Sequence, residues 1–241
     1  MLLVVNNVQK LYKGLEGFVL MREKEKTSKK ALKEKAYQLI KNRIIYCEML
    51  PGDDISEEQL ALELGTSRTP IREALLQLEK EHLVDIYPRK GTFVSQISLQ
   101  DIYEIFQIRQ IIECYAAKMV CKRISIEKLE QYREAFTHFD DDSDDYRDWM
   151  ALDREFHTYI VENTQNKNLT QIFVNILDKH QRARYVLASR IPNRVKDSVN
   201  EHFKIIDALI EQDEQKIEEA VKLHINNSRE GFLMLKGFFV N

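Results

Sequence analysis

Four side chains able to ligate a metal stand where the helical pattern of the chain's second half calls for apolar residues. Asp153 and His157 are one turn apart in an apolar stripe, and His202 and His224 each lie in the apolar stripe of a later helical segment. Gathering neutral imidazoles is costly unless a cation binds their lone pairs, so the pattern favours a metal site. Single core histidines satisfied by hydrogen bonds are the alternative. One Asp and three His suit a divalent transition metal such as Zn, Ni or Mn and leave positions open for water or an acid oxygen.

A second group of residues suits contact with nucleic acid. Arg68 and Arg72 are four residues apart and share the outward face of one predicted helix. Two guanidinium groups one turn apart can address guanine edges or phosphates in a major groove. The alternative is a solvated surface helix in which both arginines pair with Glu73 or Glu79.

The segments around these arginines predict a helix-turn-helix. Ser56 and Gly65 bound a short first helix, the serine as its cap and the glycine as its left-handed stop. The second helix begins at Ser67, whose side chain we expect to accept from amides of the first turn. Pro70 is tolerated there because those amides lack helical partners. In a helix-turn-helix the second helix reads the DNA.

A predicted β-hairpin follows this pair of helices. Residues 83–87 and 92–95 are β-prone, and residues 88–91 form the turn between them. Arg89 and Lys90 give the turn a basic tip, which would lie beside the groove while the second helix occupies it. The combination is that of a winged helix-turn-helix.

Residues 56–94, with LALELGTSRTPIREALLQLEKEHLVDIYPRKGTFV at their centre, resemble the winged-helix domain of GntR-family transcription regulators. Carried over position by position, Arg68, Thr69 and Arg72 correspond to family positions that contact operator DNA, and Gly91 to the wing glycine. The predicted DNA-binding residues are therefore Ser67, Arg68, Thr69, Arg72, Arg89, Lys90 and Gly91. One position departs, because family members often carry an arginine early in the first of the two helices, where this chain has Glu58. Its operator is therefore expected to differ from the commonest one.

The second half of the chain predicts helices only. Ser98 and Asp101 open a capped helix whose inward stripe includes Met119 and Val120, and Ser125 caps the next helix. Residues 140–145 are acidic and read as a solvated loop rather than a cation site. Further helical stretches cover about 146–163, 169–190, 195–211 and 214–236. The fold class expected is mainly α, a winged helix-turn-helix followed by an all-α antiparallel helical bundle.

From Ser98 onward the chain also resembles the FCD effector domain of one GntR subfamily, the FadR subfamily. The pattern of Asp153, His157, His202 and His224 matches the metal ligands of that family. Arg109 lies on an inward stripe, where a buried guanidinium needs an anion, and Glu113 one turn on could supply it. Since FCD domains commonly have an arginine here near the ligand cavity, an effector carboxylate is the other possible partner. His180 and Arg184 are further candidates for effector binding.

Composition frames these expectations. The chain has 241 residues, a net charge of −3 and three cysteines without a CxxC pair, as expected of reduced thiols in a cytoplasm. Residues 21–97 hold 14 basic and 13 acidic side chains, so DNA binding must depend on local placement of charge. No signal peptide or membrane span is expected. We expect an extension at 1–25, a DNA-binding domain at 26–97 and an effector-binding and dimerisation domain at 98–241.

The function expected is that of a cytoplasmic, homodimeric repressor that binds an inverted-repeat operator in double-stranded DNA and responds to a small carboxylate effector. A metal-dependent hydrolase is one alternative, since an open metal site can activate water. However, the segment from Asp153 to His157 is not HExxH, and Glu155 would point away from the ligands. A regulator with a purely structural metal is the other alternative.

Overall fold

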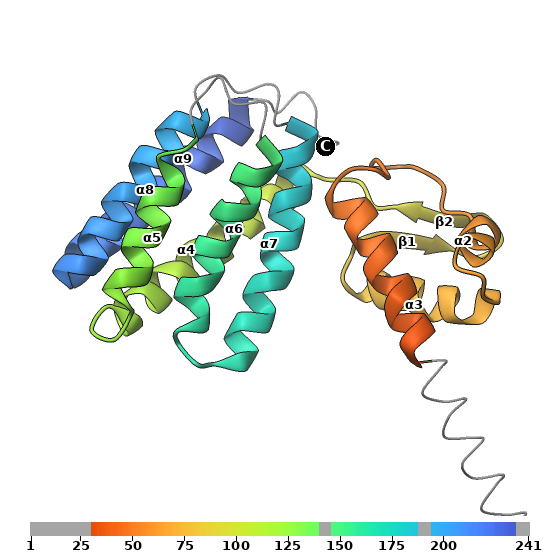
Figure 1. The fold of residues 1–241 in the computed structure, drawn as a ribbon. Coiled ribbons are helices and arrows are strands. Elements are labelled where there is room, and N and C mark those ends of the chain that lie inside the picture. Colours follow the sequence, from red (N-terminus) through yellow and green to blue (C-terminus); the bar gives the residue numbers. More distant parts are fainter. Residues whose placement is uncertain (1–29, 140–145, 188–193, 235–241) are drawn as a thin grey trace, which may run out of the picture. The chain divides into compact units, whose positions relative to one another are not determined.

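The structure is a computed structural model and describes residues 30–139, 146–187 and 194–234 (Figure 1). The chain divides into two compact units, and each is described by itself. The first unit consists of residues up to Ser95, apart from Ile45–Glu48, which group with the second unit from Gln96 onward. The predicted N-terminal extension and the acidic stretch at 140–145 lie outside the described residues, as do residues 188–193.

The first unit is a winged helix-turn-helix. It contains a helix over residues 30–45, α2 (Glu57–Glu63), α3 (Arg68–Lys80), β1 (Val84–Tyr87) and β2 (Gly91–Val94). The two strands are antiparallel, with Val84 opposite Val94 and Tyr87 opposite Gly91. The apolar faces of the helices and the hairpin share one core, which includes Ile40, Ile71, Leu75 and Leu78.

Two predictions concern the helix ends around the turn between α2 and α3. The predicted start and end of α2 are observed, whereas the predicted capping bond of α3 is not. Ser56 accepts a hydrogen bond from the backbone N–H of Gln59, and Gly65 has a positive φ of 60°. Ser67 is the N-cap residue of α3 but makes no side-chain capping bond, so that expectation was wrong. The reason is that Pro70 is the third residue of the helix and has no N–H to donate.

The wing places its basic tip in a strained turn. Arg89 has a φ of 64°, and Lys90 donates its backbone N–H to the carbonyl oxygen of Tyr87 at 3.0 Å. Gly91 has a φ of 128°, and a Cβ there would come within 3.3 Å of Asp54 Oδ1. The backbone conformation therefore favours glycine, and a Cβ would in addition crowd the side chain of Asp54.

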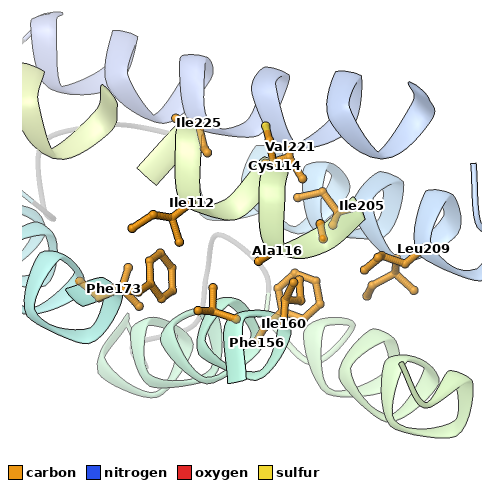
Figure 2. Close-up of a cluster of buried hydrophobic side chains, with 14 of the residues drawn as sticks. Ile112, Cys114, Ala116, Phe156, Ile160, Phe173, Ile205, Leu209, Val221 and Ile225 are labelled. Carbon is orange, nitrogen blue, oxygen red and sulfur yellow. The ribbon is translucent and has the colours of Figure 1, made fainter. Parts of the chain in front are cut away.

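The second unit is an all-helical bundle. Its helices are α4 (Leu99–Val120), α5 (Ile126–Phe136), α6 (Tyr146–Glu162), α7 (Lys167–Leu187), α8 (Arg194–Glu211) and α9 (Glu214–Met234). Ser98 and Asp101 form a capping box at the start of α4. Figure 2 shows α4 carrying Ile112 and Ala116 between apolar side chains of α6 and α7 on one side and of α8 and α9 on the other. The mainly α fold class is confirmed.

One residue of α4 departs from its predicted face. Met119 was expected in the inward stripe, but its side chain is 46% exposed. It lies four and eight residues after Tyr115 and Ile111, which are also exposed. Since residues four apart share a helix face, these three form an outward apolar stripe.

Candidate metal centre and nucleic-acid interface

The four predicted ligands come from three helices and meet inside the bundle. Asp153 and His157 lie on α6, His202 on α8 and His224 on α9, and one possible ligand atom from each lies within 4.8 Å of all the others. All four residues are buried. The sequence placed them on inward faces, and the packing of α6, α8 and α9 brings those faces to one point.

The separations suit atoms bound to one ion. His157 Nε2 lies 3.2 Å from His202 Nε2, and Asp153 Oδ1 lies 3.3 Å from His202 Nε2 and 3.9 Å from His157 Nε2. Two ligand atoms that are each about 2.1 Å from a metal, at angles of about 90 to 110°, lie about 3.0 to 3.4 Å apart. The atoms of Asp153, His157 and His202 are therefore spaced much as in a coordination sphere, and a possible ligand atom of His224 lies within 4.8 Å of them.

Two carboxylates fix which histidine nitrogens carry a lone pair. His157 donates Nδ1–H to Glu113 Oε2 at 2.7 Å, and His224 donates Nδ1–H to Glu201 Oε2 at 2.8 Å. A carboxylate only accepts, so in the neutral imidazoles the lone pair is on Nε2. This carboxylate–histidine pairing is the arrangement that orients metal-binding histidines.

His202 is oriented differently. Its ring stacks on Phe136 of α5, with centroids 4.5 Å apart and planes at 24°. Its Nδ1 is buried and has no hydrogen-bond partner among the described residues. Burial, only partly offset by Asp153, lowers the pKa of His202 to about 4, so this imidazole is neutral near neutral pH. A neutral imidazole is the form that binds a metal.

Asp153 is held as a carboxylate by a neighbouring charge. Burial alone would raise its pKa, but Arg184 Nη1, 2.5 Å from Asp153 Oδ2, together with the two histidines, holds the pKa well below the usual value. The Arg184 guanidinium also lies over the Trp149 ring, 4.3 Å from its centroid. Arg184 therefore contacts one oxygen of Asp153, while the other oxygen faces His202 and His157.

Arg109 is connected to the cluster through one carboxylate. Its Nε donates to Glu113 Oε1 at 2.6 Å, and the other oxygen of Glu113 accepts from His157. Burial opposes ionisation of Glu113, but Arg109 and His157 lower its pKa to about 2. Arg109 is thus paired with Glu113, the partner that the sequence had offered as an alternative to an effector.

One N–H group of the Arg109 guanidinium, Nη2, is buried and has no hydrogen-bond partner among the described residues. The Nη1 group of the same guanidinium lies 3.2 Å from His180 Nδ1. Burial and the neighbouring charges of Arg109 and Arg184 lower the pKa of His180 well below its usual value. Arg184 therefore contacts the cluster through Asp153, Arg109 is connected to it through Glu113, and His180 contacts Arg109.

A small cavity adjoins the cluster. It has a volume of about 10 Å³ and is lined by Glu113, Ala117, His157, Ile160, Ile205 and Val221. Such a volume holds about one water molecule. A small acid would need more space there, so its binding would require side chains around the cluster to move.

In the first unit, the two outward arginines of α3 contact the preceding helix. Arg68 Nη2 lies 2.7 Å from Glu58 Oε2, and Arg72 Nε lies 2.7 Å from Glu57 Oε2. The partners are not Glu73 or Glu79, which the sequence had suggested. Both arginine side chains remain more than half exposed, at 53% and 62%. Ser67 and Thr69 lie in the first turn of α3, and Arg89 and Lys90 lie at the wing tip, all of them exposed.

Sequence reasoning missed several supporting residues. Glu201 and Phe136 orient His224 and His202, and Glu57 and Glu58 hold the arginines. Each of these residues is a common type for its position in its own helix, and its role depends on a contact with a different helix. The inward position of Glu201, one residue before His202, was the only local signal for it.

A winged helix-turn-helix joined to an all-helical bundle with a buried Asp and His cluster defines a class of DNA-binding protein with a separate regulatory unit. Comparison with protein families agrees. Residues 32–94 match the model described as "Bacterial regulatory proteins, gntR family", and residues 104–227 match that of the FCD domain. The chain belongs to the GntR family of transcription regulators and carries an FCD domain of the FadR-like subfamily.

Individual proteins support this assignment. The HTH-type transcriptional repressor RspR of Escherichia coli is 25% identical over 210 residues, covering 84% of this chain and 90% of RspR. A probable D-xylose utilization operon transcriptional repressor of Paenarthrobacter nicotinovorans is 27% identical, with 72% and 76% covered. The solved structure of E. coli McbR/YncC shares the fold, with a TM-score of 0.72 at 18% identity, covering 85% of this chain and 98% of that one.

RspR and the Paenarthrobacter protein are described as transcriptional repressors, and the family match is to regulatory proteins, which argues against the hydrolase alternative. None of the helices within residues 30–139, 146–187 and 194–234 is long and apolar enough to cross a membrane.

Proposed function

We propose that the protein is a transcriptional repressor that acts in the cytoplasm and whose operator affinity is controlled by a small organic acid bound at a divalent metal in the bundle. The observation that carries this proposal is the buried meeting of Asp153, His157, His202 and His224. A divalent ion bound there would supply an electron-pair acceptor for an acid oxygen at the positions that protein atoms leave open. Zn, Ni and Mn all suit this donor set.

Without a metal, the cluster leaves one buried histidine nitrogen without a hydrogen-bond partner among the described residues. His157 and His202 bring their Nε2 atoms to 3.2 Å, and Glu113 already fixes the proton of His157 on Nδ1. His202 can donate through only one nitrogen in its neutral form, and its Nδ1 has no partner among the described residues. A cation bound by both Nε2 lone pairs would replace the hydrogen bond between these two nitrogens, and the His202 proton would then be on Nδ1.

The acid would be recognised by charge. Arg109 offers the unpartnered Nη2 described above, at the far side of Glu113 from His157. A carboxylate that reached both the metal and Arg109 would compete with Glu113 for the guanidinium, and His180 would line the same space. Since Glu113 also accepts a hydrogen bond from His157, binding of the acid would change the position or hydrogen bonding of this proposed metal ligand.

A thermal-shift screen of the full chain against small carboxylic acids, with metal present and after chelation, tests this function. A ligand that binds only the folded protein stabilises it by about 2.7 kcal/mol at a hundredfold excess over Kd. We expect hits that vanish on chelation and in His202→Ala, which should also lose metal by elemental analysis. Loss of stability on chelation without any acid hit would instead indicate a purely structural metal, the second candidate function.

DNA recognition is assigned to the outer face of α3 and to the wing. Arg68 and Arg72, with Ser67 and Thr69 beside them, would meet base edges and phosphates, and the wing tip of Arg89, Lys90 and Gly91 would lie against the backbone. Arg72→Ala should abolish selective operator binding while the helical circular dichroism stays unchanged. Operator preference retained in that variant would contradict the assignment.

A homodimer would place two such surfaces on an inverted repeat. The outward stripe of α4 offers a self-complementary face, because Ile111, Tyr115 and Met119 are 71%, 56% and 46% exposed. Acidic Glu104 precedes the stripe and basic Lys122 follows it, both of them exposed. An antiparallel copy of α4 that sets Ile111 opposite the partner's Tyr115 also brings Glu104 to the end of the partner's α4, which the partner's Lys122 follows. We therefore propose a second copy of this chain as the occupant of this face.

A further inference from the structure

The two arginines assigned to DNA reading do not stand alone on their surface. Glu57 and Glu58 occupy the first turn of α2, and each accepts a hydrogen bond from one arginine of α3 at 2.7 Å. The positive end of the α2 dipole favours carboxylates at this place. The surface therefore presents two acid–arginine pairs rather than two isolated positive charges.

The pairs leave the arginines able to bind something else. Arg72 is held through Nε, so its Nη1 and Nη2 groups have no partner among the described residues. Arg68 is held through Nη2, so Nε and Nη1 are likewise without a partner in the described part of the chain. A guanidinium fixed along one edge loses rotamer freedom and keeps donors for a guanine on another edge.

A carboxylate at this distance from a DNA-reading arginine must itself meet the DNA. Phosphates repel it, and the only donors in the major groove are the amino groups of cytosine and adenine. When the arginine binds the acceptors of a guanine, the neighbouring glutamate therefore needs a DNA sequence with a cytosine or adenine amino group nearby. Where the sequence offers none, the carboxylate is desolvated without a partner, which costs affinity.

We propose that Glu57 and Glu58 are specificity-determining residues of the DNA-reading surface. They orient Arg72 and Arg68, weaken contacts of these arginines with bare phosphate, and select base pairs that present an amino donor beside the guanine contact. The proposal rests on the DNA-reading role given to α3 under the proposed function. It also fits the balance of 14 basic and 13 acidic residues over 21–97, which keeps sequence-independent attraction to DNA low.

The matched control lies in the same unit. Arg43 and Glu63 form another exposed pair, with Arg43 Nη1 and Nη2 at 2.8 and 2.5 Å from the two oxygens of Glu63. Neither residue belongs to α3, so Glu63→Gln removes one acidic charge and one acid–arginine pair without touching the reading arginines. The test variants are Glu58→Gln, Glu57→Gln and the double change in the full chain.

Two measurements separate specificity from simple packing. Fluorescence anisotropy with a random-sequence duplex should show binding about 2-fold to 5-fold tighter for each carboxylate removed, the range that exposed ion pairs contribute. The salt dependence of binding should steepen by about 0.9 in log–log slope for each phosphate contact that an arginine regains. Glu63→Gln should change neither quantity.

Selection of binding sites from a random DNA library completes the test. Each test variant should lose base preference at one position in each half-site, while preferences elsewhere persist. Unchanged preferences together with unchanged affinity for random DNA would overturn the proposal. Weaker binding to operator and random DNA alike would also overturn it, since the glutamates would then only hold the two helices together. A parent protein without any base preference would reject the reading role of α3 itself, and this inference with it.

Discussion

At the scale of single residues, one carboxylate connects the two chemical features of the bundle. Glu113 accepts from Arg109 with one oxygen and from His157 with the other, and all three side chains are buried. Arg109 therefore depends on Glu113 for neutralisation, and His157 depends on it for its tautomer. Removing this single side chain affects the guanidinium and the ligand cluster together.

Glu113→Ala should destabilise the bundle by about 3 to 5 kcal/mol, because it leaves a buried guanidinium without a counter-charge. Urea unfolding followed by circular dichroism measures the loss. The double variant Arg109→Met with Glu113→Leu should recover most of it, since apolar residues of similar volume replace both charges. If the double variant were as unstable as the single one, packing rather than charge would explain the loss.

Residue types at inward positions, together with the resemblance to the FCD domain, predicted the four proposed metal ligands as a group, and the structure brings them together. Burying an Asp and three His costs free energy unless their polar atoms are satisfied, for example by a shared metal ion. Helical periodicity identifies the apolar stripe of each helix, and so the inward position of each of these residues. The carboxylates behind the histidines could not be predicted in the same way. Glu113 was noticed only as a partner for Arg109 on its own helix, because its contact with His157 depends on how α4 packs against α6.

At the scale of elements, the start of α3 shows how one residue changes a cap. Ser67 has the extended backbone of an N-cap but no capping bond, since Pro70 removes the usual donor. Ser56, at the start of α2, does accept from Gln59. Both serines were predicted as caps, and they differ in the structure because the third helical residue is Gln59 after Ser56 and Pro70 after Ser67.

Ser56→Ala should therefore lower the free energy of unfolding of the first unit by about 0.5 to 1 kcal/mol, the usual loss for a capping side chain. Ser67→Ala in the same unit should have a smaller effect, because no capping bond is lost. Denaturant midpoints of the two variants give the comparison directly. Equal losses would show that Ser67 caps α3 in solution.

The positions of the helices could be predicted because helical periodicity is strong in this chain. The helix face on which Met119 lies could not be predicted in this way. α4 runs for 22 residues, and 3.6 residues per turn leaves a choice of stripe near its end. Exposure of Met119 depends on which neighbours cover α4 there, which a single helix does not reveal. The same limit hid the outward stripe that the dimer proposal uses.

At the scale of the whole molecule, the proposed pairing of two copies through α4 leads to a charge-reversal prediction. Glu104→Lys or Lys122→Glu alone should weaken the dimer, because each brings like charges near one another across the two-fold axis. The double reversal restores opposite charges and should restore the dimer. Sedimentation over a range of concentrations measures the constants, with the exposed Glu134→Lys on α5 as control. A double variant no better than the single ones would exclude this antiparallel pairing.

The two units have separate apolar cores, and the proposed metal ligands belong only to the second. Chelation should therefore lower the melting transition of the bundle, by about 2 to 4 °C for each kcal/mol of lost metal binding, and leave that of the winged helix in place. Hydrogen exchange resolved by segment distinguishes the two transitions. Equal loss of protection in α3 and α8 would show that the units unfold together.

The order of the ligands along the chain has a consequence for biosynthesis. The winged helix is complete by Ser95, whereas the ligand cluster needs His224 on α9, the last helix described. Because domains fold as units while the ribosome is still translating, the DNA-binding unit can fold long before the proposed metal site is complete. Under the proposed function, a nascent chain therefore passes through a stage with a folded DNA-binding unit and an incomplete effector site. That stage ends only when α9 leaves the ribosome and packs into the bundle.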